Sequence, residues 1–478
     1  MTSTKKKAVS NVVWSAIERF SVQGIQYIIS IIIARILMPS DYGLIAMIGV
    51  FIVVFQTFID GGFGNALIQK KNRTEIDYST VFFFNIAIAF ALYFLLCLSA
   101  PYIAAFYNEP KLDIITRVIG LILIINSFGI VQQAKLTIAL DFKRQAVAAL
   151  IAVTISGFIG IIMAYHGYGV WALVWHTLLN NLLKVVLLSL FTKWRPMAVF
   201  SIESFKGLFS FGSKILLSSL LHTIYTNLYT LVIGKKFAST DLGYFNRAST
   251  LAQFPSTNFT NVIVRAIYPI QCKMQDDKQQ LNSMFLVYLR MACYIIFPIM
   301  IGLCVLAEPL IKLLLTNKWL PAVPFFQILC IAYMWDPIMK INHNILNVNG
   351  RSDFFLQAEV VKKIIAIIIL LTTIPFGIMV MCIGLVAYAF ADMIIIIHYT
   401  EKLTEITLLK QTKELLPIIL LSFSMGAVIY LSTFITTHTS LKLVIGSIVG
   451  VMYYFAGSHF LHFKELSQLT SLITKNKQ

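Results

Sequence analysis

Apolar residues form long runs that recur along the whole chain, separated by short polar segments. Each run is long enough to cross a bilayer as a helix, which needs about 20 residues. The runs are continuous and do not alternate with polar positions, so they predict helices and not the strands of a barrel. The pattern predicts about fourteen membrane-spanning helices, centred near residues 24, 55, 90, 125, 155, 180, 220, 255, 292, 332, 368, 388, 424 and 452.

A second pattern is a repeat within the chain. ARILMPSDYGLIAM at residues 34–47 aligns with GKKFASTDLGYFNR at residues 234–247, which places Asp41 on Asp241 at an offset of 200. Two repeats with a substrate site between them are typical of transporters. The repeat predicts an all-α membrane protein with a six-helix lobe at 1–200, a second at 201–405, and two further helices with a tail at 406–478. Chance matching of apolar runs remains the alternative.

Composition agrees with this class. The 478 residues are 58% hydrophobic and only 12% charged, with a mean hydropathy of +0.81, as in an integral membrane protein. No connection is long enough to fold as a catalytic domain, so we do not expect an enzyme. The six cysteines show no paired spacing, and His459 and His462 have no third ligand nearby. We therefore expect neither a metal site nor a cofactor.

The net charge of +17 follows from the predicted topology. Basic residues concentrate in alternate connections, and such connections face the cytoplasm in membrane proteins. This bias predicts that both termini are cytoplasmic and makes nucleic-acid binding a poor explanation of the charge. The basic residues of the predicted cytoplasmic connections are Lys70, Lys71, Arg73, Lys143, Arg144, Lys193, Arg195, Lys206, Lys273, Lys278, Arg351, Lys402, Lys410 and Lys413.

Polar stripes run along some of the predicted spans. Arg19, Gln23 and Gln26 lie on one face of the first helix because they are spaced four and three residues apart. The segment 241–269 carries polar residues on nearly every side, Gln253 among them. Such helices favour contact with a water-filled cavity over contact with lipid. A polar contact between two packed helices is the alternative, because Ser and Thr also join helices in membranes.

Charged residues inside spans are costly and usually functional. We expect Arg19, Lys214, Arg247 and Arg290 to line the cavity and to favour phosphate or acidic sugars. Lys362 and Lys363 lie near predicted span ends, which indicates contact with lipid headgroups instead. Asp336 and Lys340 are four residues apart and are expected to neutralise each other.

The stretch at residues 34–47, followed by FIDGGFGNALIQK, STVFFFN, APYIAAFY and GYFNRA, resembles the Wzx-type polysaccharide and O-antigen flippases, in particular their WzxC-like branch. These belong to the multidrug/oligosaccharidyl-lipid/polysaccharide exporter superfamily. The resemblance implies transport of an undecaprenyl-diphosphate-linked oligosaccharide across the bacterial inner membrane by alternating access. It also implies that Arg247, in GYFNRA, faces the cavity and binds the diphosphate.

The resemblance leaves the coupling ion, H⁺ or Na⁺, open. Acidic positions common in the superfamily fall on Asp41 and Asp60, whereas the cation-binding aspartate of the drug exporters has no evident counterpart in the first helix. Glu18 is the nearest carboxylate there. Membrane lipids and a polysaccharide polymerase or ligase are the other partners implied.

Two further questions stay open at this stage. The turns Arg35–Asp41 and Lys235–Asp241 are expected to form a gate at the periplasmic mouth, although Asp41 and Asp241 would equally serve as helix N-caps. A flippase competes with a cation-coupled multidrug exporter of the same fold and with a membrane-bound polymerase or ligase. The basic cavity disfavours the drug exporter, and the short exterior loops disfavour the polymerase.

Overall fold

The computed structural model describes residues 21–467, which are almost entirely helical and contain no strand within that range. Eleven helices in this range are long and apolar enough to cross a membrane, and a shorter apolar helix, Ser21–Ile36, precedes them. The predicted all-α membrane class is thus confirmed, while the exact number of fourteen spans remains a prediction. The chain divides into two compact units, one ending at Gly243 and one beginning at Tyr244.

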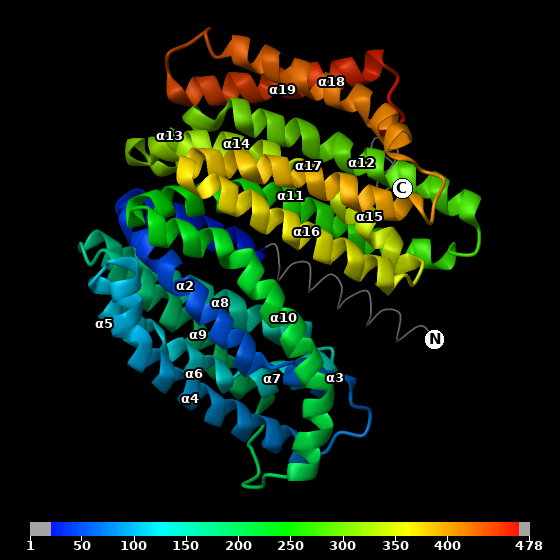
Figure 1. Cartoon of the computed structure of the whole chain (residues 1–478). Helices are drawn as coiled ribbons and strands as arrows, with labels where there is room; N and C mark the ends of the chain where they lie inside the picture. Colours follow the sequence, from blue (N-terminus) through cyan, green and yellow to red (C-terminus); the bar gives the residue numbers. More distant parts are fainter. Residues whose placement is uncertain (1–20, 468–478) are drawn as a thin grey trace. The chain divides into compact units, whose positions relative to one another are not determined.

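The first described element of the first unit is the helix Ser21–Ile36, which packs on α8 and α9 through Ile29 and Ile33. Its elements are α2 (Pro39–Asp60), α3 (Phe63–Gln69), α4 (Glu75–Tyr107), α5 (Lys111–Ile119), α6 (Leu121–Ser127), α7 (Ile130–Ile138), α8 (Phe142–Tyr165), α9 (Val170–Thr192) and α10 (Ile202–Lys236) (Figure 1). Helix α11 (Ser239–Lys273) starts in this unit and continues into the second.

Glycines divide two of the spans in the first unit. Gly61 and Gly62 have φ values of +46° and +73°, a left-handed backbone that costs glycine least, and they separate α2 from α3. Gly62 lies against α10, where a Cβ atom would come within 2.7 Å of the Gly212 carbonyl oxygen. Gly120 and Gly129 separate α5, α6 and α7. The break after α2 therefore packs directly against the backbone of α10.

A polar clasp holds the connection between α9 and α10 on the first turns of α4. The backbone N–H of Met197 donates to Ser79 Oγ at 2.9 Å, and that of Ser201 donates to Thr80 Oγ1 at 3.1 Å. Asp77, the buried partner of Lys70 at 2.7 Å, also accepts a hydrogen bond from Ser204. Beyond the clasp, α10 packs along α2, α3 and α4.

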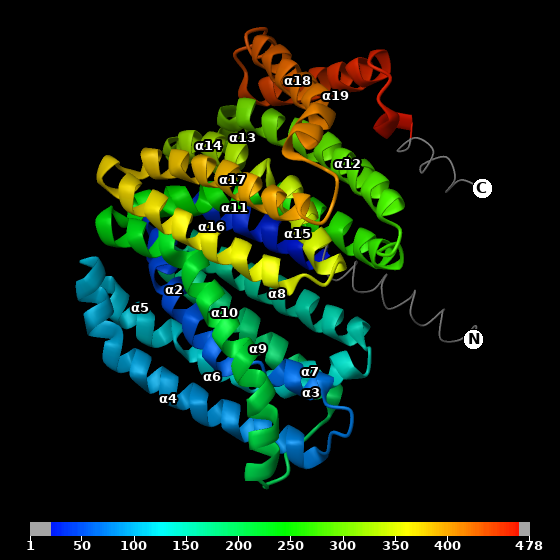
Figure 2. The same ribbon diagram turned by 45° about the vertical axis from the view of Figure 1, so that its right-hand side comes forward.

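The second unit contains most of α11 and a further series of helices and short 3-10 segments. These are α12 (Lys278–Val305), α13 (Ala307–Leu315), η1 (Asn317–Ala322), α14 (Val323–Tyr333), α15 (Asp336–Val348), α16 (Ser352–Thr373), η2 (Ile374–Phe376), α17 (Ile378–Glu401), α18 (Leu408–Ser432) and α19 (Thr439–Phe460). Helices α18 and α19 lie side by side, and they contact α12 and α13 (Figures 1 and 2).

The order of elements shows a parallel between the two halves of the chain. Each half contains a span made of several short helices, which are α5–α7 in the first half and η1, α14 and α15 in the second. Helix α10, which opens the predicted second lobe, nevertheless packs on α2, and the Oγ1 atoms of Thr57 and Thr223 lie 3.2 Å apart. The lobe boundaries at residues 200 and 405 stay a prediction.

Candidate functional site

A polar pocket of about 540 Å³ opens in the first unit beside the break between α2 and α3. Residues of α2, α3, α7 and α10 line it, and the pocket includes Gly62 of the break itself. Its polar side chains are those of Thr57, Asp60, Asn65, Gln133, Thr137 and Ser219. Asp60, predicted from the sequence as a coupling or gating residue, therefore lies in a cavity of ligand-binding size.

A short chain of hydrogen bonds leads to the Asp60 carboxylate. Asn126 of α6 donates to Gln56 Oε1 at 3.0 Å, and the Gln56 amide in turn donates to Asp60 Oδ1 at 2.9 Å. One carboxylate oxygen is thus held by α2 and α6. The glycine doublet that follows Asp60 in the sequence was the signal that could have located this pocket, because it marks a break in a span.

The two predicted gate turns approach each other backbone to backbone. A Cβ atom on Gly43 would lie 1.7 Å from the Ser239 carbonyl oxygen, and one on Gly243 would lie 1.9 Å from the Pro39 carbonyl oxygen. Both glycines occupy the same position of the repeat, so each turn places its glycine against a carbonyl oxygen of the other turn. Only glycine allows this approach.

Asp41 and Lys235, which belong to these turns, have local partners. The Asp41 carboxylate accepts a hydrogen bond from the Met38 backbone N–H at 3.0 Å, as a residue in the first turn of a helix does. Lys235 donates to the Phe106 carbonyl oxygen and lies over the Phe106 ring. Asp241 is half-buried in the first turn of α11, and Arg35 is exposed. Met38 is the N-cap of α2, so Asp41 is the third residue of the helix and not its N-cap as predicted. The gating role of Asp41 remains a prediction.

Part of the predicted stripe on the first helix lies outside the described residues. Glu18 and Arg19 fall there, as does the side chain of Lys214 on α10. Gln23 is half-buried and Gln26 is exposed.

Helix α11 is 35 residues long but is not among the eleven apolar spans, because it is too polar. Arg247 lies deep in it with 5% of its surface exposed. Ser249 bonds to the Tyr333 hydroxyl at 3.1 Å, and Ser256 donates to the Tyr333 carbonyl oxygen at 2.7 Å. Gln253 is exposed. One side of α11 therefore forms the polar helix contact that was the alternative, here with α14, while Gln253 lies on exposed surface.

Arg290 of α12 is engaged by two carboxylates. Its Nη1 atom lies 2.7 Å from Glu414 Oε2 on α18, and its Nε atom donates to Glu465 beyond α19. These partners are 124 and 175 residues away in the sequence, so no local pattern could have indicated them. The charge expected to line a cavity is thus balanced within the second unit.

Lys362 corrects the expectation of a headgroup contact. Its side chain is buried, with 8% of the residue exposed, and its Nζ atom lies 2.6 Å from Glu359 Oε1 and 3.1 Å from Asp392 Oδ1. Lys362 cannot reach a headgroup because it joins α16 to α17 inside the unit. The predicted pair of Asp336 and Lys340 is confirmed at 3.5 Å.

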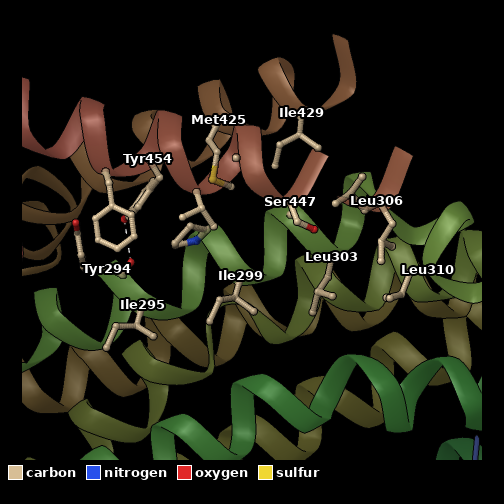
Figure 3. A pocket seen from close by; sticks show the side chains of 16 residues that line it. Tyr294, Ile295, Ile299, Leu303, Leu306, Leu310, Met425, Ile429, Ser447 and Tyr454 are labelled. Carbon is tan, nitrogen blue, oxygen red and sulfur yellow. Dashed lines mark hydrogen bonds between the residues drawn. The ribbon is translucent and has the colours of Figure 1, made fainter. Parts of the chain in front are cut away.

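The sequence interpretation missed an apolar groove of about 450 Å³ in the second unit. Figure 3 shows it between α12 and α13 on one side and α18 and α19 on the other, with Ile299, Leu303 and Ile429 among its lining side chains. Tyr294 donates to Ser458 Oγ at 2.8 Å, and Tyr454 donates to the Tyr294 carbonyl oxygen at 2.9 Å. These bonds satisfy the polar atoms at one end of the groove.

Residues 21–467 contain no group of three His, Cys, Asp or Glu side chains that could hold a metal ion. All six cysteines are free thiols.

The chain matches a protein family and several proteins that are connected by name to polysaccharide biosynthesis. The family described as polysaccharide biosynthesis protein matches residues 32–324, more than half of the chain. The teichuronic acid biosynthesis protein TuaB of Bacillus subtilis is 26% identical over 355 residues, which are 74% of each chain. The lipopolysaccharide biosynthesis protein WzxC of Escherichia coli is 25% identical over 371 residues, 76% of this chain and 75% of that protein.

Among solved structures, the lipid II flippase MurJ in an inward closed conformation has a similar fold. The TM-score is 0.77, and the match covers 94% of this chain and 99% of that one at 17% sequence identity. At this identity the likeness concerns the fold. It confirms the fold that the resemblance in the sequence implied.

Proposed function

Because the chain belongs to the family of polysaccharide biosynthesis proteins, we propose that it moves a polyprenyl-diphosphate-linked oligosaccharide across the bacterial inner membrane by alternating access. The family match over residues 32–324 is the observation that carries the proposal. The names of TuaB and WzxC connect those relatives to teichuronic acid and lipopolysaccharide, both of them glycans. A protein with the same fold is a lipid flippase. The cargo we propose has a lipid, a diphosphate and a glycan.

The apolar groove supports the lipid part of this cargo. Its lining by Ile299, Leu303, Ile429 and their neighbours offers apolar contact along α12 and α18. A polyprenyl chain is a branched hydrocarbon, and within the bilayer it would gain van der Waals contact with such a surface. The groove lies in the unit that also holds Arg247.

Arg247 is the residue we propose for the diphosphate. A diphosphate crosses the membrane interior only beside fixed cations, and guanidinium offers two parallel N–H donors to phosphate oxygens. Arg19 and Lys214 complete the proposed set of cations, with Gln23, Gln26 and Gln253 as polar lining. We leave Arg290 out of this set because its guanidinium already bonds to Glu414 and Glu465.

The topology belongs to the same proposal. Both termini lie in the cytoplasm, and the turns around Asp41 and Asp241 close the periplasmic mouth, with Arg35 at its edge. Glu18 and Asp60 are the carboxylates we propose for coupling to H⁺ or Na⁺. A polysaccharide polymerase or ligase then receives the exported unit.

Deletion of the gene tests the function directly. Cells without the protein are expected to lose surface polysaccharide and to accumulate undecaprenyl-linked glycan on the cytoplasmic side of the membrane, and re-expression should restore both. Normal polysaccharide together with increased sensitivity to cationic drugs would instead support the multidrug exporter.

A further inference from the structure

We propose that the polar pocket between α2, α3, α7 and α10 binds the glycan of the cargo. This inference rests on the proposed function and adds a location for sugar recognition. The pocket belongs entirely to the first unit, and its volume of about 540 Å³ falls within the usual range for small-molecule sites.

Three polar side chains of the pocket are available to a ligand. Within residues 21–467, the amides of Asn65 and Gln133 and the hydroxyl of Ser219 make no hydrogen bond to another residue. An amide presents two donor hydrogens and an acceptor oxygen, and a hydroxyl does both. Sugar hydroxyls also donate and accept, so these three groups match a carbohydrate better than a purely anionic or purely apolar ligand.

The other polar side chains of the pocket are held in place. Thr57 donates to the Val53 carbonyl oxygen at 2.8 Å, and Thr137 accepts from the Gln145 amide at 3.3 Å. Asp60 is oriented by Gln56 through one carboxylate oxygen. Its second oxygen is left to accept from a sugar hydroxyl, a charge-assisted bond that is stronger than a neutral one.

The described side chains that line the pocket favour a sugar over a phosphate. Among the described residues that line it there is no Lys or Arg, and the one ionisable group is the Asp60 carboxylate. A diphosphate would be repelled by this carboxylate, whereas a neutral or amino sugar would not be. The described lining of the pocket therefore suits the glycan and not the diphosphate.

The predicted topology places the pocket near the cytoplasmic side, where the cargo would bind first. Ile68, which lines it, lies two residues before Lys70 in a connection that the charge pattern assigns to the cytoplasm. A lipid-linked glycan made in the cytoplasm would meet this end of the first unit before transport. The pocket would then select the cargo by its sugars at the entry step.

The test uses the full chain in lipid nanodiscs and two probes. One is synthetic undecaprenyl diphosphate, and the other is the lipid-linked glycan extracted from cells that lack the protein. Binding of the glycan lipid should be at least about tenfold tighter than that of the bare lipid. Asn65→Ala and Gln133→Ala should each lower this ratio about fivefold, the effect of one lost hydrogen bond.

Two controls make the result specific. Gln69→Ala changes an exposed amide on the same helix, α3, outside the pocket, and should leave the ratio unchanged. Arg247→Ala should weaken binding of both lipids alike. The pocket proposal fails if Asn65→Ala and Gln133→Ala keep the wild-type ratio, or if the wild-type protein binds the two lipids equally. Failure to bind either lipid would instead count against the proposed function.

Discussion

Arg247 shows how a single residue can combine burial with charge. With 5% of its surface exposed, it lies in a helix too polar to rank among the apolar spans. A buried guanidinium is costly unless its surroundings hold it, and such residues usually mark function in membrane proteins. The resemblance of GYFNRA to the flippases indicates the same residue from the sequence alone.

We expect Arg247→Ala to reduce export about tenfold or more, because a charge-assisted hydrogen bond to phosphate contributes about 1.5–3 kcal/mol. Arg247→Lys should retain part of the activity, since it keeps the charge and loses the planar pair of donors. The measurement is surface polysaccharide and cytoplasmic lipid-linked glycan at equal expression. Arg265→Ala, at an exposed position of the same helix, is the matched control. Full export by Arg247→Ala contradicts the role.

Arg290 is expected to act on stability. Arg290→Met removes the cation that Glu414 and Glu465 share. It should lower the free energy of unfolding by on the order of 3 kcal/mol, because carboxylates left partly buried without a cation are destabilising. The melting temperature of the purified protein should fall. Export per folded molecule should stay near the wild-type value, and a specific loss of export at an unchanged melting temperature would return Arg290 to the cavity.

At the scale of elements, the contact between the starts of α2 and α11 depends on two glycines. Gly43 and Gly243 let the two backbones touch, and each Cβ atom would overlap a carbonyl oxygen of the opposite turn. The repeat in the sequence predicted that these turns correspond. It could not show that they meet, because the offset of 200 residues says nothing of distance in space.

Gly43→Ala and Gly243→Ala should each push the two turns apart, at a cost of about 1–3 kcal/mol, and should strongly reduce export if these turns form the gate. Gly49→Ala is the matched control in α2, since a Cβ atom there meets nothing within 4 Å. Alanine at that position should even favour the helix slightly. Export by Gly43→Ala equal to that of Gly49→Ala would remove the turn contact from the mechanism.

At the scale of the whole molecule, the sequence predicted the class and the fold because lipid-facing helices depend on composition and length. It could not predict pairings between distant elements. Lys362 was expected at a headgroup, yet it bonds to Glu359 and Asp392, and the second of these is 30 residues away on another helix. The polar pocket likewise combines four helices. Only Asp60 and the glycine doublet after it could be identified in advance.

The topology gives a prediction for the entire chain. In a background without native cysteines, Asn72→Cys in the connection after α3 should be protected from an impermeant thiol reagent in intact cells. Lys111→Cys, at the start of α5, should react. Both positions are exposed, so access from one side of the membrane decides the outcome. The opposite labelling pattern would invert the orientation together with the proposed cytoplasmic position of the pocket.

The clasp between α4 and the connection from α9 to α10 has a consequence for cleavage of the chain. Domains are usually joined by exposed linkers that a protease can cut. Here the chain passes from one compact unit to the other inside α11, between Gly243 and Tyr244, and the connection at residues 193–201 is hydrogen-bonded to α4. A cut in that connection would leave α10 packed on α2, so the two fragments should remain together as one particle.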